Sequence, residues 1–313
     1  MKLACIDVGS NTVRLLISEV NNRGKLKRLN TKRVVTHLGS ALSETKALNI
    51  TGKNLTVKAL SKFIDLSKKY NVSHIYAVGT SALRESKDGQ EFVDTIRKLL
   101  DINIEIISGQ REAQLTYEGI KASLDNVDHT LILDIGGGST ECVYMEGEKI
   151  MHTSIPIGAI KLYDLFIKKD PPSKEEIIDA KTYVLTKLSN SKLAIDKPFK
   201  KELLATGGTA TTLATIDLEI NRYNGQKVHL HRLTRQRVLH IFKQLINTPF
   251  KERLKLKGLE KKRAKIIITG LLILIEIMDF TKSKALTISD YGLLEGLMFE
   301  KSLEANSFST HRT

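Results

Sequence analysis

The sequence predicts an α/β protein built from two duplicated domains. Residues 3–12, Leu-Ala-Cys-Ile-Asp-Val-Gly-Ser-Asn-Thr, are nearly repeated at 131–140, Leu-Ile-Leu-Asp-Ile-Gly-Gly-Gly-Ser-Thr. Each copy has an apolar run, an aspartate, a turn of small residues and a second β-rich run, which together predict a strand-turn-strand unit. With 313 residues, 41% of them hydrophobic, the chain is long enough to form two cores.

The first half is expected to have the order β-β-β-α-β-α-β-α. Alternating patterns predict the opening strands, and a turn is expected at 21–24. Thr51 is the expected N-cap of the first helix. The expected strands are 3–8, 13–19, 27–36, 74–78 and 104–107, and the expected helices are about 53–70, 91–100 and 110–123.

The second half restarts in the same way near Thr130, with three strands at 131–134, 141–145 and 150–155. Helices are expected at 157–167 and 175–193, followed by a short strand at 203–205, a largely helical stretch to 280, a strand at 285–289 and a closing helix from about 293. Two α/β halves that each open with three strands suit an actin-like, ribonuclease H-like fold with a cleft between the domains, the second enlarged by helices.

The expected domains are 1–125 and 126–305, with the last helix, about 293–305, packing back on the first domain. The polar residues 306–313 are expected to be a disordered tail.

The cysteines and the N-terminal sequence indicate that the protein resides in a reducing compartment. Cys5 and Cys142 lie in expected strands, and no CxxC or HExxH spacing is present, so we expect buried thiols and no zinc site. No secretory signal pattern opens the chain. The apolar stretch 266–280 has 15 residues, with Glu276 inside, whereas a membrane span needs roughly 20. We therefore expect a cytoplasmic protein that does not cross a membrane.

The charge distribution favours an anionic partner. The net charge is +14; residues 222–265 carry fourteen Lys or Arg against two acids, and 23–33 carry six against none. Such segments attract polyanions, although solvated helix faces are the ordinary alternative. Aromatic residues make up 5% and tryptophan is absent, which argues against a sequence-specific nucleic-acid partner.

The sharpest motif is the glycine turn of the second repeat. Gly136, Gly137 and Gly138 leave backbone amides open to a phosphate, and Ser139 adds a hydroxyl donor. Asp134, at the strand end, can hold Mg²⁺ directly or through water. The motif is neither a dinucleotide fingerprint nor a Walker loop, because a strand follows it and the lysine is missing. A purely structural hairpin turn is the alternative.

Two further turns have a similar composition. Asp7 precedes Ser10, Asn11 and Thr12, and alternation places Arg14 on the same face as Thr12, where it could reach a phosphate. The third turn, Gly207-Gly208-Thr209, opens a helix, whose amino end favours an anion. A surface arginine and a structural glycine pair are the alternative interpretations.

Glu112 is the candidate general base. It lies in the first turn of an expected helix, where helix capping alone would also explain an acid. Hydrolysis of a phosphoanhydride needs a water aligned with the leaving group, which a carboxylate can polarise. Arg84, after the preceding strand, is expected to neutralise phosphate charge nearby.

Eight ordered sequence blocks resemble the exopolyphosphatase and guanosine pentaphosphate phosphohydrolase family of the actin-like superfamily. They are IDVGSNTVRLLI, GTSALRE, IISGQREA, LILDIGGGSTE, SIPIGAIKL, ATGGTATTLA, RAKIIITG and ISDYGLLEG. The resemblance implies Glu112 as catalytic base, and Asp134 and Glu141 in metal and water positioning. It also implies residues 136–139 as the phosphate loop and Arg14, Arg84 and Arg263 as phosphate ligands. Asp7 is a third expected metal ligand, for Mg²⁺ or alternatively Mn²⁺.

The expected function is Mg²⁺-dependent hydrolysis of the terminal phosphoanhydride of polyphosphate or guanosine pentaphosphate. An actin-like ATP-dependent kinase and a non-catalytic polyanion or alarmone sensor are the alternatives. Arg111 replaces an acid that many relatives have, which could favour an anionic substrate. The chain is expected to be a short form without the additional C-terminal helical region of long members, which puts processivity on long polymers in doubt. A homodimer is also consistent with the resemblance.

Overall fold

The computed structural model describes residues 1–21, 26–40, 42–124, 127, 130–147, 149–191, 193 and 202–309. Contacts between residues divide the chain into two units. Unit 1 comprises Met1–Asp125 and Tyr291–Thr313, and unit 2 comprises Asn126–Asp290. The chain thus passes from unit 1 to unit 2 and returns once.

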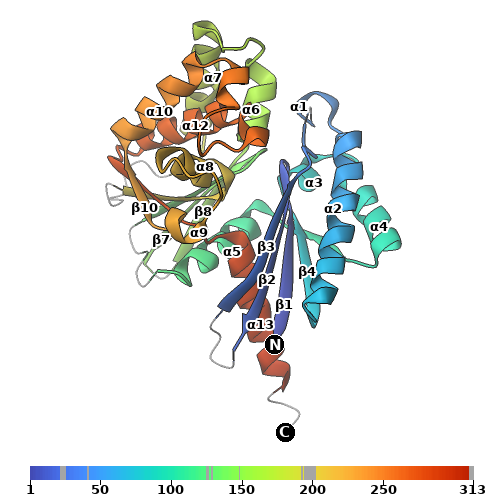
Figure 1. Cartoon of the computed structure of the whole chain (residues 1–313). Helices are drawn as coiled ribbons and strands as arrows, with labels where there is room; N and C mark the ends of the chain where they lie inside the picture. Colours follow the sequence, from blue (N-terminus) through green and yellow to red (C-terminus); the bar gives the residue numbers. More distant parts are fainter. Residues whose placement is uncertain are drawn as a thin grey trace. The chain divides into compact units, whose positions relative to one another are not determined.

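Unit 1 is built on a five-stranded sheet of order β3-β2-β1-β4-β5. The first three strands pair antiparallel with one another, β1 with β2 and β2 with β3. β4 pairs parallel with β1, and β5 pairs parallel with β4. β1 is buried along nearly its whole length because helices cover both faces of the sheet (Figure 1). The strands are β1 (Lys2–Val8), β2 (Thr12–Val20), β3 (Leu26–Val35), β4 (His74–Gly79) and β5 (Ile104–Ile106).

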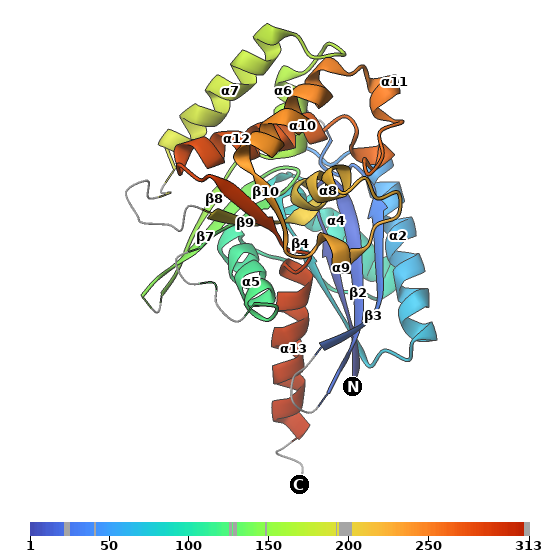
Figure 2. The same ribbon diagram turned by 60° about the vertical axis from the view of Figure 1, so that its left-hand side comes forward.

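Two pairs of helices enclose this sheet. One pair, α2 (Ile50–Lys69) and α4 (Gly89–Leu100), covers one face, and α5 (Gly109–Lys121) and α13 (Leu293–Ser309) cover the other. Figure 2 shows α13 beside the strands of unit 1, although it is the last element of the chain. The short helices are α1 (Leu42–Thr45) and α3 (Ser81–Glu85).

Unit 2 repeats the same sheet order with one additional strand. Its order is β10-β11-β9-β6-β7-β8, in which β8-β7-β6-β9-β11 corresponds to β3-β2-β1-β4-β5. The additional strand β10 pairs antiparallel with β11 at the edge. The strands are β6 (Leu131–Ile135), β7 (Thr140–Glu146), β8 (Lys149–Ile155), β9 (Glu202–Thr206), β10 (His231–Thr234) and β11 (Ala285–Ile288).

The helices of unit 2 share one large core with its sheet. α12 is apolar around its circumference, and its buried Glu276 lies 3.0 Å from Lys181 Nζ. Within the described residues, no helix is long and apolar enough to span a membrane. The helices are α6 (Ala159–Phe166), α7 (Lys174–Ser189), α8 (Gly207–Asp217), α9 (Gly225–Val228), α10 (Arg235–Asn247), α11 (Phe250–Arg253), the 3₁₀ helix η1 (Lys261–Arg263) and α12 (Ile267–Phe280).

The expected fold class, two α/β halves with a ribonuclease H-like strand order, is confirmed. Some local expectations are wrong. Asn49, not Thr51, caps α2, because its side-chain oxygen accepts a 2.8 Å bond from Gly52 N. β10 lies where only helices were expected, and α13 runs to Ser309, where a disordered tail was expected from residue 306. Most of the expected turn at 21–24 lies outside the described residues.

Both cysteines are buried and free, as expected. Burial raises the pKa of the Cys5 thiol well above its usual value, and burial together with the Glu141 carboxylate raises the pKa of Cys142. Both thiols are therefore poor nucleophiles. The cytoplasmic location stays a prediction.

Candidate functional site

In unit 1, the predicted site residues Asp7 and Arg14 form an ion pair. They lie directly opposite each other on β1 and β2, and Nε and Nη2 of Arg14 both lie 2.7 Å from Oδ2 of Asp7. The Asp7 side chain is buried, whereas the Arg14 side chain keeps 28% of its surface exposed. Asp7 therefore orients an arginine that can still reach an anion.

The turn after Asp7 contains buried polar atoms that lack partners. Oδ1 of Asp7 and both Oδ1 and Nδ2 of Asn11 make no hydrogen bond within the part of the chain that the structure describes. A buried unsatisfied polar group costs about 1–3 kcal/mol, so such a cluster indicates a place for water, an ion or a ligand. The turn is held in place by its backbone, since Asn11 O accepts from Thr36 N at 2.9 Å and Ser10 O accepts from Gly39 N at 2.8 Å.

Glu112 and Arg84 come together at the same edge of the sheet. β4 ends beside β1, where Thr80 N donates to Val8 O, and α5 begins after β5 with Ser108 as its N-cap. Arg84 Nη1 lies 3.2 Å from Glu112 Oε2 and donates to Ile107 O at 2.8 Å. The carboxylate is buried and fixed in orientation, so Arg84 acts on Glu112 directly, a contact that the sequence does not reveal.

The positive charge of Arg111, which could favour an anionic substrate, is engaged in contacts within unit 1. Its guanidinium bonds both carboxylate oxygens of Glu300 on α13, and its Nη1 lies 3.2 Å from Gln114 Oε1. Glu300 raises the pKa of the Arg111 guanidinium. Arg111 therefore connects α5 to α13.

In unit 2, the equivalent row of residues is acidic. Asp134 on β6 lies directly opposite Glu141 on β7, which lies directly opposite Ser154 on β8. Ser154 Oγ donates to Glu141 Oε1 at 2.9 Å, and both carboxylates are buried. Adjacent carboxylates on one sheet face repel each other, and a cation relieves that repulsion.

The glycine loop offers open backbone amides. Its carbonyls point to α6, because Gly136 O accepts from Ala159 N and Gly137 O accepts from Ile160 N, both at 2.9 Å. Among the described residues, the amides of Gly137, Gly138 and Ser139 donate to no protein acceptor. These three amides can therefore bind an anion.

Gly158 sets the position of this loop. A Cβ at that residue would lie 2.4 Å from C and O of Gly137 and 2.5 Å from N of Gly138. Gly158 and Ser154 are site residues that the sequence reasoning assigned no role, although both fall in the SIPIGAIKL block that carries the resemblance.

The third turn lies against groups of the same unit. Gly207 has a φ of +81°, and a Cβ there would lie 2.2 Å from Asp134 Oδ1. A Cβ at Gly208 would lie 2.1 Å from Arg263 Nη2, so the buried guanidinium packs on the amino-terminal turn of α8. Thr209 Oγ1 is 3.5 Å from Ile135 O.

The structure therefore brings several predicted site residues together within unit 2. They are Asp134, Glu141, residues 136–139, residues 207–209 and Arg263.

The donor set suits a hard cation in part. No group of three His, Cys, Asp or Glu side chains in the described residues is placed to hold a metal ion. Mg²⁺ is commonly held by one or two carboxylates together with substrate phosphates, which the pair Asp134 and Glu141 could provide. Asp7 fits less well than expected, because Arg14 already neutralises it, although its Oδ1 makes no hydrogen bond to any residue that the structure describes.

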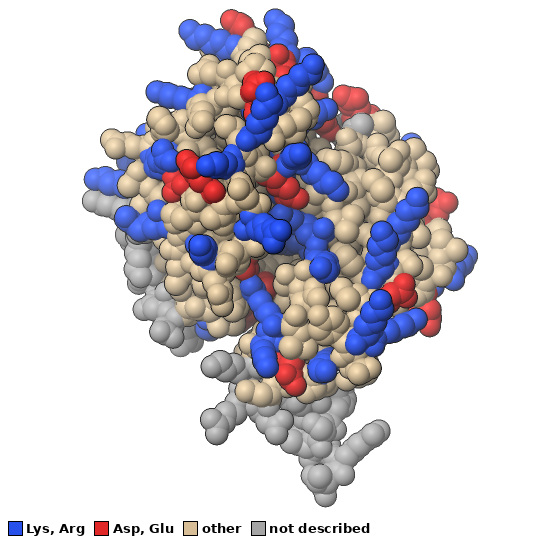
Figure 3. Space-filling model, in the orientation of Figure 1, with Lys and Arg blue, Asp and Glu red and all other residues tan. Residues whose placement is uncertain are grey.

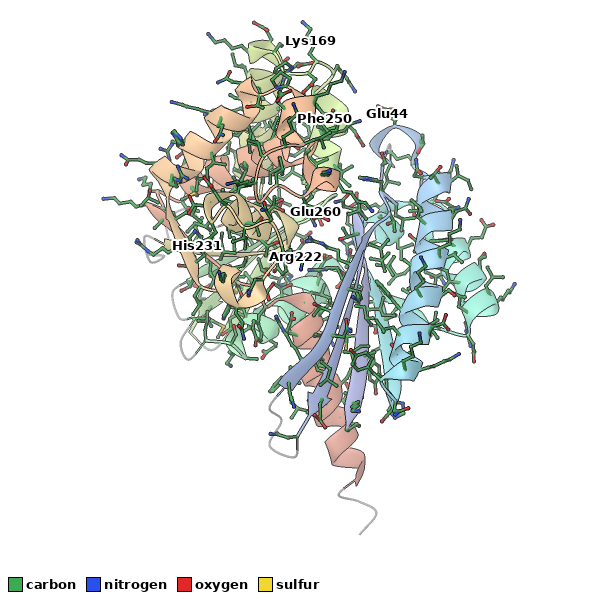
Figure 4. The ribbon with its side chains drawn as sticks, viewed as in Figure 1. Glu44, Lys169, Arg222, His231, Phe250 and Glu260 are labelled. Carbon is green, nitrogen blue, oxygen red and sulfur yellow. The ribbon has the colours of Figure 1, made fainter. Side chains whose placement is uncertain are left out.

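The basic segment 222–265 is less positive in space than in sequence. Acids of unit 2, both outside and within the segment, pair with several of its cations, and Figure 4 shows Arg222, His231, Phe250 and Glu260 at separate places. Figure 3 shows acidic side chains among the basic ones on the visible face. The pairs are Arg235–Asp279, Arg237–Asp217, Arg253–Asp170, Lys257–Glu219, Lys255–Glu252 and Arg263–Glu260.

The duplicated sheets define a protein of the actin-like class. More particularly, the chain belongs to the Ppx/GppA phosphatase family, whose model matches residues 16–305.

Among curated relatives, the bifunctional 3-dehydroquinate synthase/phosphatase of Fusobacterium nucleatum is 31% identical over 95% of this chain, which spans 46% of that protein. Exopolyphosphatase 2 of Mycobacterium tuberculosis is 26% identical, with 95% and 97% covered. A guanosine-5'-triphosphate,3'-diphosphate pyrophosphatase of Vibrio cholerae is 27% identical, with 95% and 58% covered.

Solved structures agree with the family assignment. The Ppx/GppA family member of Aquifex aeolicus has a TM-score of 0.81 at 32% identity, covering 98% of this chain and 99% of that one. An exopolyphosphatase of Cytophaga hutchinsonii has a TM-score of 0.88 at 28% identity, with 96% and 97% covered.

Proposed function

We propose that this protein is an Mg²⁺-dependent hydrolase that releases the terminal phosphate of inorganic polyphosphate, of guanosine pentaphosphate, or of both. Its relatives include proteins named for each of these activities. The observation that carries the proposal is Glu112, a buried carboxylate at the first turn of α5 whose orientation Arg84 fixes.

The chemistry follows from these residues. Glu112 accepts a proton from a water whose oxygen forms a bond to the terminal phosphorus, and the bridging P–O bond breaks. Orthophosphate leaves together with the shortened chain or nucleotide.

Within unit 1, the guanidinium of Arg14 stabilises the negative charge of the phosphate. Within unit 2, the amides of Gly137, Gly138 and Ser139 are open to an anion. Asp134 and Glu141 would hold Mg²⁺, which when bound would neutralise further phosphate charge.

Orthophosphate release tests the proposal. Short polyphosphate, long polyphosphate, guanosine pentaphosphate and ATP are each incubated with the full chain and Mg²⁺ or Mn²⁺, and with EDTA as control. We expect metal-dependent release from at least one of the first three substrates. Transfer from ATP to a sugar or acid, without any release from polyphosphate, would indicate a kinase, and binding without turnover would indicate a sensor.

The homodimer that the resemblance suggests stays a prediction.

A further inference from the structure

Helices α5 and α13 of unit 1 meet along residues that are spaced by four on both helices. A Cβ at Gly119 on α5 would lie 2.0 Å from the carbonyl oxygen of Gly292, which directly precedes α13. A Cβ at Gly296 on α13 would lie 1.8 Å from the carbonyl oxygen of Leu115 on α5. Glycine at these positions therefore lets the two helices pack antiparallel with their backbones in contact.

The next residues along this contact form an ion pair. Four residues before Leu115 lies Arg111, and four residues after Gly296 lies Glu300. The Arg111 guanidinium donates to both carboxylate oxygens of Glu300, which fixes the orientation of the two side chains. Both side chains are partly exposed, and such pairs contribute little to stability. The effect of this pair is therefore expected mainly in local geometry.

The start of α5 is a place where an external contact matters. The helix opens with Gly109, a poor helix former, and with Gln110, whose side chain is exposed. Its first amides have no partner within the helix, and Ser108 caps it by accepting a 3.1 Å bond from Arg111 N. Helix ends open locally at a lower free energy than helix centres. The ion pair to α13 adds a second anchor to this turn.

We propose that Glu300 is a positioning residue for the general base. By holding Arg111, Glu300 keeps the first turn of α5 where the Glu112 carboxylate accepts the proton of the attacking water. Arg111 and Glu112 are consecutive residues of that turn, so a displacement of one moves the other. Arg84 orients the Glu112 side chain, whereas Glu300 holds the backbone that carries it. This inference rests on the proposed function, in which Glu112 is the base.

Steady-state kinetics of phosphate release by Glu300→Gln test this role on the substrate that the wild type uses best. We expect kcat to fall about tenfold, because a misplaced catalytic group costs rate steeply. KM should change less than about twofold, because the lost interaction acts in the transition state. Arg111→Gln should give the same pattern, and the double variant should lose no more than either single variant, since the pair acts as a unit. Glu300→Asp, which keeps the charge, should recover part of the loss.

Glu105→Gln is the matched control. The hydrogen bonds from Glu300 raise the pKa of the Arg111 guanidinium most, and the charge of Glu105 on β5 raises it further. The Glu105 side chain is exposed and forms no ion pair with any cation that the structure describes. Its replacement removes a nearby negative charge without removing a contact, so we expect kcat and KM to change less than about twofold.

Hydrogen–deuterium exchange of the substrate-free chain separates this inference from the proposed function. The backbone amides of the first turn of α5 should exchange at least about fivefold faster in Glu300→Gln than in the wild type. In Glu105→Gln they should exchange at the wild-type rate. If exchange rises as expected while the wild-type chain releases no orthophosphate from any substrate, the hydrolase proposal fails and the anchoring of this turn by Glu300 stands.

Three results would overturn the positioning role. The first is unchanged exchange in Glu300→Gln. The second is a lower melting temperature of Glu300→Gln with wild-type kcat, which would make the pair merely structural. The third is a raised KM in Arg111→Gln that Glu300→Gln does not share, which would assign Arg111 to substrate binding.

Discussion

The two copies of the strand-turn-strand unit carry matched rows of residues whose summed formal charges have opposite signs. The unit 1 row of Asp7, Arg14 and Arg33 has one acid and two cations, whereas the unit 2 row of Asp134, Glu141 and Ser154 has two acids and a hydroxyl. The backbone pairing is the same in both. The first aspartate thus keeps its position in both copies, while its two cross-strand neighbours differ in charge between the units.

The turns of the two units also differ in the kind of polar group that they offer. Among the described residues, the unit 1 turn has buried side-chain atoms without hydrogen-bond partners, at Asp7 and Asn11, whereas the unit 2 turn presents backbone amides in a run of three glycines. Side chains can be exchanged without moving the chain, but bare amides need glycine and a fixed loop. The second copy is thus the more demanding of the two in backbone geometry.

The largest expected effect tests whether unit 1 supplies the group that activates water. Glu112→Gln keeps the size of the side chain and removes its basicity, so we expect kcat for phosphate release to fall about 10²- to 10⁴-fold. Glu118→Gln, on the same helix, is the control and should change kcat less than about twofold. Steady-state kinetics on the substrate that the wild type uses best give the measurement. Wild-type kcat in Glu112→Gln would remove the general-base assignment.

The charge contrast predicts a difference in metal dependence. If the unit 2 row holds Mg²⁺, Glu141→Gln should raise the Mg²⁺ concentration needed for half-maximal activity by about 10- to 100-fold, the range typical of losing an interaction at a metal site. Arg14→Gln removes a charge from the unit 1 row instead, and we expect it to raise KM with little change in the Mg²⁺ requirement. Titration of activity with Mg²⁺ checks both. The reverse result would assign the metal to Asp7.

The tightness of the second turn predicts a difference in stability. A Cβ at Gly158 would meet rigid backbone at 2.4 Å, whereas a Cβ at Gly9 in the first turn would meet Thr12 O at 3.2 Å. We expect Gly158→Ala to lower the free energy of unfolding by about 1–3 kcal/mol, as overpacking does, and Gly9→Ala to lower it by less. Thermal melting without substrate compares them. Equal losses would mean that the loop moves aside easily.

The strand order and the glycine-containing turns could be predicted because the repeat, the alternation and the glycines are local signals. Cross-strand and long-range contacts could not. The pairing of Arg84 with Glu112, and of Arg111 with Glu300, joins residues 28 and 189 positions apart. Arg263 is seen to pack on Gly208 only in the folded chain. β10 was missed because four residues beside a long helix carry too little pattern.

The smallest expected effect concerns pH and the core of unit 2. Burial raises the pKa of Glu276 on α12 above its ordinary 4.5, against the opposing effect of Lys181; Asp279 raises it further and Arg235 lowers it. A raised pKa means that the folded chain binds the proton more tightly than the unfolded one, so stability falls as pH rises from about 4.5 through the folded-state value. Glu276→Gln removes this dependence. We expect the melting temperature of the wild type to fall by about 2 °C more than that of the variant across this range, as measured by scanning calorimetry. Parallel pH profiles would show that Lys181 compensates the burial fully.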